Sequence, residues 1–181
     1  IGTLICDEDE LVEQQVVTGI AYAKDEAQIS LRDVADKPGV AESVFGPLAD
    51  ANINVDMIVQ NTSTEGTTDI SFTVPSADLK VADEIVSRIA REMSAAGVTQ
   101  DSEIAKVSLV GAGMKTSPGI AARMFRCLAD AAVNIEMIST STIRISVVIT
   151  ASDLETAARS LHAEFDLDSG ESYSAPLPER K

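Results

Sequence analysis

Val34-Ala35-Asp36-Lys37-Pro38-Gly39-Val40 is the stretch that decides the fold, because a strand pattern ends there and a helical pattern begins. The same junction returns eighty residues later as Met114-Lys115-Thr116-Ser117-Pro118-Gly119-Ile120. Proline suits the first position of a helix, where no backbone donor is needed, and glycine lets another molecule approach the backbone closely. The repeat predicts two copies of one structural unit, each with a strand-to-helix turn of this kind.

Each turn predicts a small anion site at the start of the helix that follows it. The free backbone N–H groups from Gly39 to Ala41 and from Gly119 to Ala121 lie at the positive end of a helix dipole. A carboxylate fits such a site. The alternative is that Pro-Gly only opens each helix, but its recurrence in a matching context favours the site.

The composition indicates a globular chain with an acidic surface. The 181 residues are 45% hydrophobic, and 29 acidic against 14 basic residues give a formal charge of −15. This charge argues against nucleic acid or an anionic membrane surface as a partner. No apolar run reaches the length of a membrane span. Cys6 and Cys127 form no CxxC motif, which indicates reduced thiols in a cytoplasmic protein.

The first unit is predicted as β-α-β-β-α-β. We expect Val16 to Ala23 to form a hairpin with Ala27 to Val34, turning at Lys24-Asp25-Glu26. The remaining elements are predicted, in order, as a helix from Val40 to about Asp50, strands at Val55–Asn61 and Asp69–Val74, a helix from Pro75-Ser76 that Gly97 closes, and a weak strand at Val98–Asp101.

The second unit repeats this order. Leu128-Ala129-Asp130-Ala131 copies Leu48-Ala49-Asp50-Ala51, and Asn134-Ile135-Glu136-Met137-Ile138 copies Asn54-Val55-Asp56-Met57-Ile58. The copies preserve an amide, an acid and a pattern of core positions. Duplication on this scale predicts two similar domains in one chain.

A fourth strand is missing from the second unit, because only polar sequence follows its closing helix. We expect the arm Val16 to Ala23 to cross over and supply that strand, so that the first unit is inserted within the second. The predicted fold class is α+β. The predicted division is an exposed lead-in at 1–15, a first domain at 24–101, a second domain at 16–23 and 102–167, and a polar tail at 168–181.

The motifs of a catalytic centre are missing from the sequence. It holds no phosphate-binding GxxxxGK[ST], no GxGxxG, no GxSxG and no cluster of metal ligands, and His162 is its one histidine. Gly111-Ala112-Gly113 follows a strand as a nucleotide loop would, but the third glycine is missing. We predict no catalytic residue, no metal and no cofactor, and therefore a binding module.

An amino acid is the ligand that the polar residues favour, with its carboxylate at a helix start. The candidate acceptors for its ammonium group are Asp36, Asp56 and Glu136, or nearby carbonyls, and the candidate partners of a side-chain hydroxyl are Asn54, Asn134 and Gln60. Taken singly, each is also explained as a turn former or a solvated strand residue. Their duplication beside the helix starts, at one end of both units, favours a site.

The chain resembles the regulatory region of aspartate kinase, which carries two ACT domains. The resemblance runs from about Val16 to Leu167. The segments that carry it are Asp36-Lys37-Pro38-Gly39, Asn54–Asn61, Thr67–Phe72, Lys106–Met114 and Asn134–Ser141. It implies two ferredoxin-like βαββαβ domains, the first inserted within the second, and no kinase active site in this stretch.

The resemblance also implies a function in feedback inhibition of aspartate-family amino-acid biosynthesis. In that family threonine and lysine bind where the first ACT domain of one chain meets the second ACT domain of its partner. It therefore implies a homodimer, a catalytic subunit or domain as partner, and threonine as effector, with lysine as a second candidate. The alternative is a free-standing amino-acid sensor that acts on a partner other than a kinase. The predicted effector-binding residues are Asp36, Lys37, Pro38, Gly39, Val40, Ala41, Asn54, Val55, Asp56, Gln60, Ser117, Pro118, Gly119, Ile120, Ala121, Asn134, Ile135, Glu136, Ser141 and Thr142.

Two departures from the family concern lysine. Where the family commonly has Ser-His-Pro-Gly this chain has Thr116-Ser117-Pro118-Gly119, and where it has Ser-Thr-Ser-Glu-Ile this chain has Ser139-Thr140-Ser141-Thr142-Ile143. The family's glutamate suits the ε-ammonium of lysine, whereas Thr142 offers only a neutral hydroxyl. We therefore expect weak lysine binding. The alternative is that Asp36 or Glu136 neutralises the lysine instead.

Overall fold

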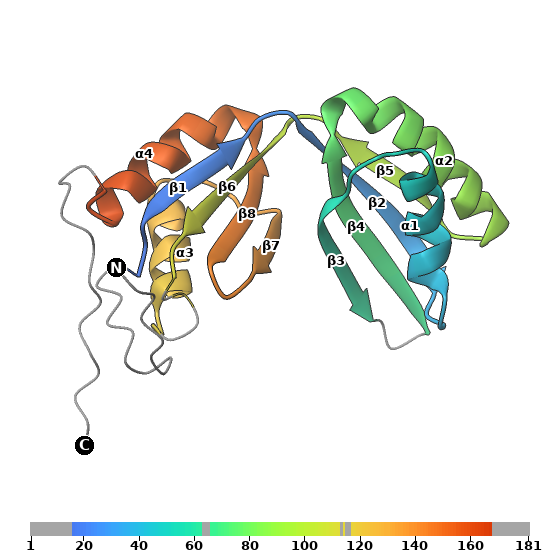
Figure 1. Ribbon diagram of the computed structural model, residues 1–181, viewed down its shortest axis with the longest axis horizontal. Helices are drawn as coiled ribbons and strands as arrows, with labels where there is room; N and C mark the ends of the chain where they lie inside the picture. The colour runs from blue at the N-terminus through green and yellow to red at the C-terminus, as the bar shows by residue number, and fades with distance from the viewer. Residues whose placement is uncertain (1–15, 63–65, 113, 115–116, 168–181) are drawn as a thin grey trace, which may run out of the picture.

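The structure is a computed structural model that describes residues 16–62, 66–112, 114 and 117–167. The predicted lead-in at 1–15 and tail at 168–181 lie outside the described residues, as does Cys6. The described strands form two antiparallel sheets of four strands each, and helices cover one face of each sheet (Figure 1). This is the α+β arrangement that the sequence predicts.

The first unit contains a sheet with the strand order β3-β4-β2-β5, in which all neighbours are antiparallel. The predicted weak strand is confirmed as β5. The second helix ends at Glu92, earlier than predicted, because Ser94 takes a left-handed conformation and Gly97 already begins β5. The elements are β2 (Glu26–Ala35), α1 (Val40–Asp50), β3 (Asp56–Thr62), β4 (Thr67–Pro75), a 3₁₀ turn (Ser76–Asp78), α2 (Leu79–Glu92) and β5 (Gly97–Asp101).

The second unit has the strand order β1-β6-β8-β7. Its elements are β1 (Gly19–Ala23), β6 (Ile104–Val110), α3 (Ile120–Asp130), β7 (Met137–Thr140), β8 (Arg144–Thr150), a 3₁₀ turn (Ala151–Asp153) and α4 (Leu154–Glu164). The prediction of a hairpin between 16–23 and 27–34 is wrong. Instead β1 pairs with β6, from Gly19 opposite Val110 to Ala23 opposite Lys106. The chain therefore continues from a strand of one sheet directly into a strand of the other.

Each unit has its own hydrophobic core between its sheet and its two helices. In the first, Phe72 of β4 is fully buried and its ring meets Phe45 of α1 edge-on, with centroids 5.2 Å apart. In the second, Met124 of α3 and Phe165 after α4 are fully buried against β6 and β8. These positions follow the helical and strand periods of the sequence. The core residues hold each sheet against its helices. The loops at the ends of the sheets lie mostly outside these cores and can therefore form a binding site.

The two units also contact one another away from their helices. Met57, Ile104, Met137 and Val148 form a small buried cluster of residues from both units. Figure 1 shows the link from β1 to β2 and the link from β5 to β6 close together at one end of both sheets. Residues near these links can therefore contact both units.

Candidate functional site

Both Pro-Gly turns open a helix, as predicted. Gly39 and Gly119 precede α1 and α3 with φ angles of 93° and 98°, in the left-handed region that favours glycine. No described side chain caps either helix, which leaves backbone N–H groups of the first turns for an anion, although the Val40 N–H donates to the Lys37 carbonyl at 3.4 Å. At both glycines the place where a Cβ would stand has nothing within 4 Å. The helix starts are open on the side where a ligand would approach.

One predicted cluster is brought together in the second unit. A cavity of about 510 Å³ lies at the start of α3 and is lined on one side by Ser117, Pro118, Gly119 and Ala121. On its other side lie Thr140, Ser141 and Thr142, where β7 turns into β8. Backbone donors for a carboxylate and hydroxyl groups therefore face the same space. The side chain of Ile120 is buried in the core, which leaves only its backbone for a ligand.

The corresponding residues of the first unit also gather at one end of their sheet. Asp36 donates its backbone N–H to the carbonyl of Gly66 at 2.9 Å, and this loop leads into α1. Gln60 lies near the end of β3, opposite Ile70 and close to that loop. Both Asp36 and Gln60 are exposed, as are Lys37, Pro38, Gly39 and Ala41, whereas Val40 packs inward.

The segments Asn54–Asp56 and Asn134–Glu136 do not lie beside the helix start of their own unit. Asp56 begins β3 opposite Thr73, at the end of the sheet where β2 begins, whereas the Pro-Gly turn follows the end of β2. Likewise Glu136 donates its backbone N–H to Val148 at 2.9 Å, at the far end of the second sheet. The prediction that these amides and acids sit beside their own loops is wrong.

The length of the helices explains this separation. Helix α1 has 11 residues, which corresponds to roughly 16 Å of rise. It carries the chain from one end of the sheet to the other before β3 begins, and α3 does the same in the second unit. Within one chain, each helix start and the amide-acid segment that follows it therefore lie at opposite ends of the sheet.

Asp56 is engaged by a lysine that the sequence analysis missed. The Lys106 ammonium donates to Asp56 Oδ2 and to Glu26 Oε1, and Asp56 Oδ1 accepts the N–H of Met57 at 2.9 Å. The side chains of Lys106 and Glu26 are only 12% and 14% exposed, against 53% for Asp56. The visible signal is a lysine inside the largely apolar strand IAKVSLV. Asp56 is thus tied to the second unit instead of free for an ammonium ligand.

The titration of this group follows from its contacts. The hydrogen bond from Lys106 holds the pKa of Asp56 below its usual range, against the opposing effect of burial. Burial alone would lower the pKa of Lys106, but the hydrogen bonds to Asp56 and Glu26 outweigh it and the pKa is raised. Both partners are therefore charged at neutral pH.

Other chemistry has little support among the described residues. No group of three or more His, Cys, Asp or Glu side chains in that part of the chain is arranged to hold a metal ion. Burial raises the pKa of the Cys127 thiol, which keeps it protonated and a poor nucleophile at neutral pH. His162 is half-buried in α4. None of the described helices is long and apolar enough to cross a membrane.

Two βαββαβ units with open helix starts define a protein of the tandem ACT class. The ACT domain family matches residues 28–92 and 107–165. Aspartate kinase of Pseudomonas fluorescens is 51% identical over 168 residues, which are 92% of this chain and 41% of that protein. The crystal structure of aspartokinase alpha and beta subunits contains a chain with 51% identity and a TM-score of 0.79, with 84% of this chain and 100% of that chain covered.

A second solved structure gives the same result. The ligand-free regulatory subunit of aspartate kinase from Thermus thermophilus is 40% identical with a TM-score of 0.79, and 83% of this chain and 99% of that chain are covered. The chain belongs to the aspartokinase family and corresponds to its regulatory part, as the sequence resemblance predicts. It spans about 41% of the length of the full kinase relative from Pseudomonas fluorescens.

Proposed function

We propose that this chain binds threonine as a feedback effector and passes its occupancy to a catalytic aspartate kinase subunit or domain. The observation that carries the proposal is the pair of uncapped helix starts, each with open space beside its glycine. Backbone N–H groups there suit an α-carboxylate. A cytoplasmic location and a role in aspartate-family amino-acid biosynthesis go with the same proposal.

Each effector site is completed by a second copy of the chain. In one chain the segment Asn54–Asp56 lies at the opposite end of its sheet from Gly39, and Asn134–Glu136 lies likewise far from Gly119. A homodimer that sets the first domain of one copy beside the second domain of the other would bring these halves together. Ile58 and Ile138, which are 53% and 44% exposed on the edge strands β3 and β7, are apolar groups that such a dimer would cover.

The threonine site would use the helix start Asp36–Ala41 for the carboxylate and Gln60 for the hydroxyl. Gln60 is exposed near that loop, and its amide can both donate to and accept from a hydroxyl. The cavity at Ser117–Ala121 would be the second effector site. Within one chain, its described lining offers Ser141 and Thr142 but no carboxylate, so any counter-charge for the ε-ammonium of lysine would have to come from the second copy.

The proposed domain division follows the strand pairing. The first domain would comprise 24–101, and the second would comprise 16–23 with 102–167, because β1 pairs with β6 and not with β2. The two domains then share two chain crossings. Such a connection would let a change in one domain reach the other.

Sedimentation equilibrium with and without threonine tests the proposal. We expect the mass to rise toward two chains as threonine saturates, because a ligand bound between copies stabilises the dimer. A chain that stays monomeric at saturating threonine would contradict it. Co-purification with a separate catalytic chain then distinguishes a kinase regulator from a free-standing sensor.

A further inference from the structure

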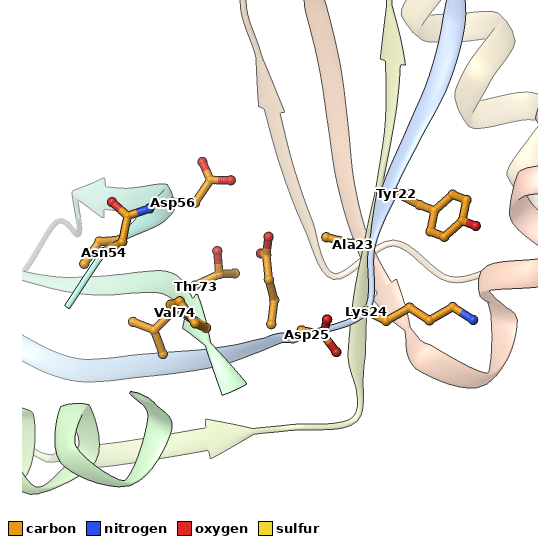
Figure 2. Close-up of a pocket in the computed structure, with 11 residues that line it drawn as sticks. Tyr22, Ala23, Lys24, Asp25, Asn54, Asp56, Thr73 and Val74 are labelled. Carbon is orange, nitrogen blue, oxygen red and sulfur yellow. The ribbon is translucent and has the colours of Figure 1, made fainter. Parts of the chain in front are cut away.

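A second cavity, apart from both helix starts, lies where the first sheet meets the link between the units. Its volume is about 600 Å³, and its lining includes Glu26, Asn54, Asp56 and Thr73. Figure 2 shows Asn54, Asp56 and Thr73 on one side of this space, whereas the side chains of Tyr22 and Lys24 point away from them. The polar groups on that side of the space come from the first unit, and Val55, Val74 and Pro75 line the cavity with them.

Three side-chain oxygens in or beside this corner are buried and lack a hydrogen-bond partner among the described residues. They are Glu26 Oε2, Gln28 Oε1 and Thr73 Oγ1, and Thr73 is fully buried. Two of them belong to residues that line the cavity, whereas Gln28 lies next to it and donates its amide N–H to Ser30 Oγ at 3.2 Å. The strand register places them together, because Gln28 lies opposite Thr73 and Glu26 lies two residues before Gln28 on the same face of β2. Two of these oxygens are acceptors only, and the Thr73 hydroxyl can donate or accept. Buried polar groups without a partner are costly, so such groups indicate a missing partner.

The internal repeat shows that the fold does not require these oxygens. In the second unit Lys106 lies opposite Val148 as Gln28 lies opposite Thr73, and Ile104 occupies the place of Glu26. There Ile104, Val148 and Met137 pack into a buried apolar cluster. The same corner of the same fold is thus closed by hydrocarbon in one unit and left polar, with unsatisfied oxygens, in the other.

The charges of the corner select the kind of ligand. Two carboxylates, Glu26 and Asp56, share the ammonium group of Lys106, so these three bonded groups together carry one negative charge. Lys24 and Asp25, which also line the cavity, carry opposite charges, and the positive charge of Arg144 also acts on Asp56. The unpartnered atoms are a carboxylate, an amide carbonyl and a hydroxyl, all of them oxygens that suit hard cations. A divalent ion would exceed the remaining charge and lie near the Lys106 ammonium.

We propose that this corner binds one small monovalent cation, held by Glu26 Oε2, Gln28 Oε1 and Thr73 Oγ1 beside the Lys106 bridge. The cation is an alkali-metal ion or the ammonium group of an amine. Its binding would add to the contacts that join the first sheet to the second unit. The three oxygens that would hold the cation are not among the proposed effector-binding residues, although Asn54 and Asp56, which line the same cavity, are. The test of the cation site needs no threonine.

Melting curves of the full chain in chloride salts of equal ionic strength test this site. The salts are potassium, sodium and methylammonium chloride, with tetramethylammonium chloride as the reference, because its methyl groups prevent contact with the oxygens. Because the ionic strength is equal, the general screening of a chain with a charge of −15 is the same in every salt, and screening cannot account for a difference in melting temperature from one salt to another. We expect a saturable rise in melting temperature in at least one of the three salts. The methylammonium arm distinguishes an amine from a metal ion.

Thr73→Val connects that rise to the corner. The variant removes one oxygen while keeping the shape, and we expect the apparent cation affinity to fall by about tenfold or more. Thr99→Val is the matched control, because Thr99 is exposed on β5 of the same sheet. If Thr73→Val does not fold, Glu26→Gln serves the same purpose. Equal melting temperatures in all four salts, or a full salt-specific rise in the variant, would overturn the site.

Discussion

Lys106→Met is the substitution that tests the connection between the two units most strongly. The described ion pairs that link the units both use Lys106, which reaches from β6 to Glu26 and Asp56 of the first unit. Methionine keeps the length and the apolar stem but removes the ammonium. The variant therefore leaves the Glu26 carboxylate, which is 14% exposed, without its counter-charge.

The expected cost comes mainly from Glu26. Removing one partner of a buried ion pair costs about 3–5 kcal/mol, because the other charge stays buried and unpaired. The pair with Asp56 adds at most about 1 kcal/mol, since that carboxylate is 53% exposed and water screens it. We expect the free energy of unfolding to fall by about 3–5 kcal/mol. For a chain of this size the melting temperature would fall by about 6–20 °C.

Urea denaturation followed by far-ultraviolet circular dichroism measures this loss. Glu26→Gln and the double variant complete a double-mutant cycle. We expect the double variant to lose less than the sum of the single losses, because it leaves no buried charge unpaired. Lys80→Met, at an exposed position of α2, is the matched control and should change little. A loss under about 0.5 kcal/mol for Lys106→Met, or simple additivity, would refute the reasoning.

Three further predictions concern single side chains. Because the pKa of Asp56 is held below its usual 3.8, its ionised form stabilises the folded chain. The difference in unfolding free energy between the wild type and Asp56→Asn should therefore be constant near neutral pH and shrink as the pH falls through the pKa of Asp56 in the folded chain. A difference that does not change with pH down to about 2 would contradict this prediction. Gln60→Ala should weaken threonine binding by about 0.5–1.5 kcal/mol, measured by calorimetry, and unchanged affinity would remove Gln60 from the site. Thr142→Glu should strengthen lysine binding by about ten- to a hundred-fold, and equal affinity in both chains would leave Asp36 or Glu136 as the counter-charge.

Local patterns in the sequence predict most of the fold. The periods of apolar residues predict the four α-helices and the strands of both sheets in the described part of the chain. The duplicated Pro-Gly turns identify the starts of α1 and α3. These features depend on neighbours a few residues apart, which a sequence displays directly. The pairing of β1 with the second sheet could be predicted in part, because the sequence of the second unit lacks a fourth strand pattern.

Contacts between residues far apart in the sequence could not be predicted from such local patterns. Lys106 and Glu26 are eighty residues apart, and no local pattern around either residue predicts that they pair. The hairpin prediction failed for a related reason, since adjacent strand patterns do not specify whether they pair with one another. The amide-acid segments were misplaced because repetition in sequence does not show which end of a sheet a segment occupies.

A melting curve of the chain with and without millimolar threonine tests the central proposal most directly. Threonine at a hundred times its dissociation constant should stabilise the folded chain by about 2.7 kcal/mol and raise the melting temperature by about 5–10 °C. Alanine, which has the same carboxylate and ammonium groups but no hydroxyl, is the matched control and should raise it less. A melting temperature that millimolar threonine leaves unmoved would contradict the account.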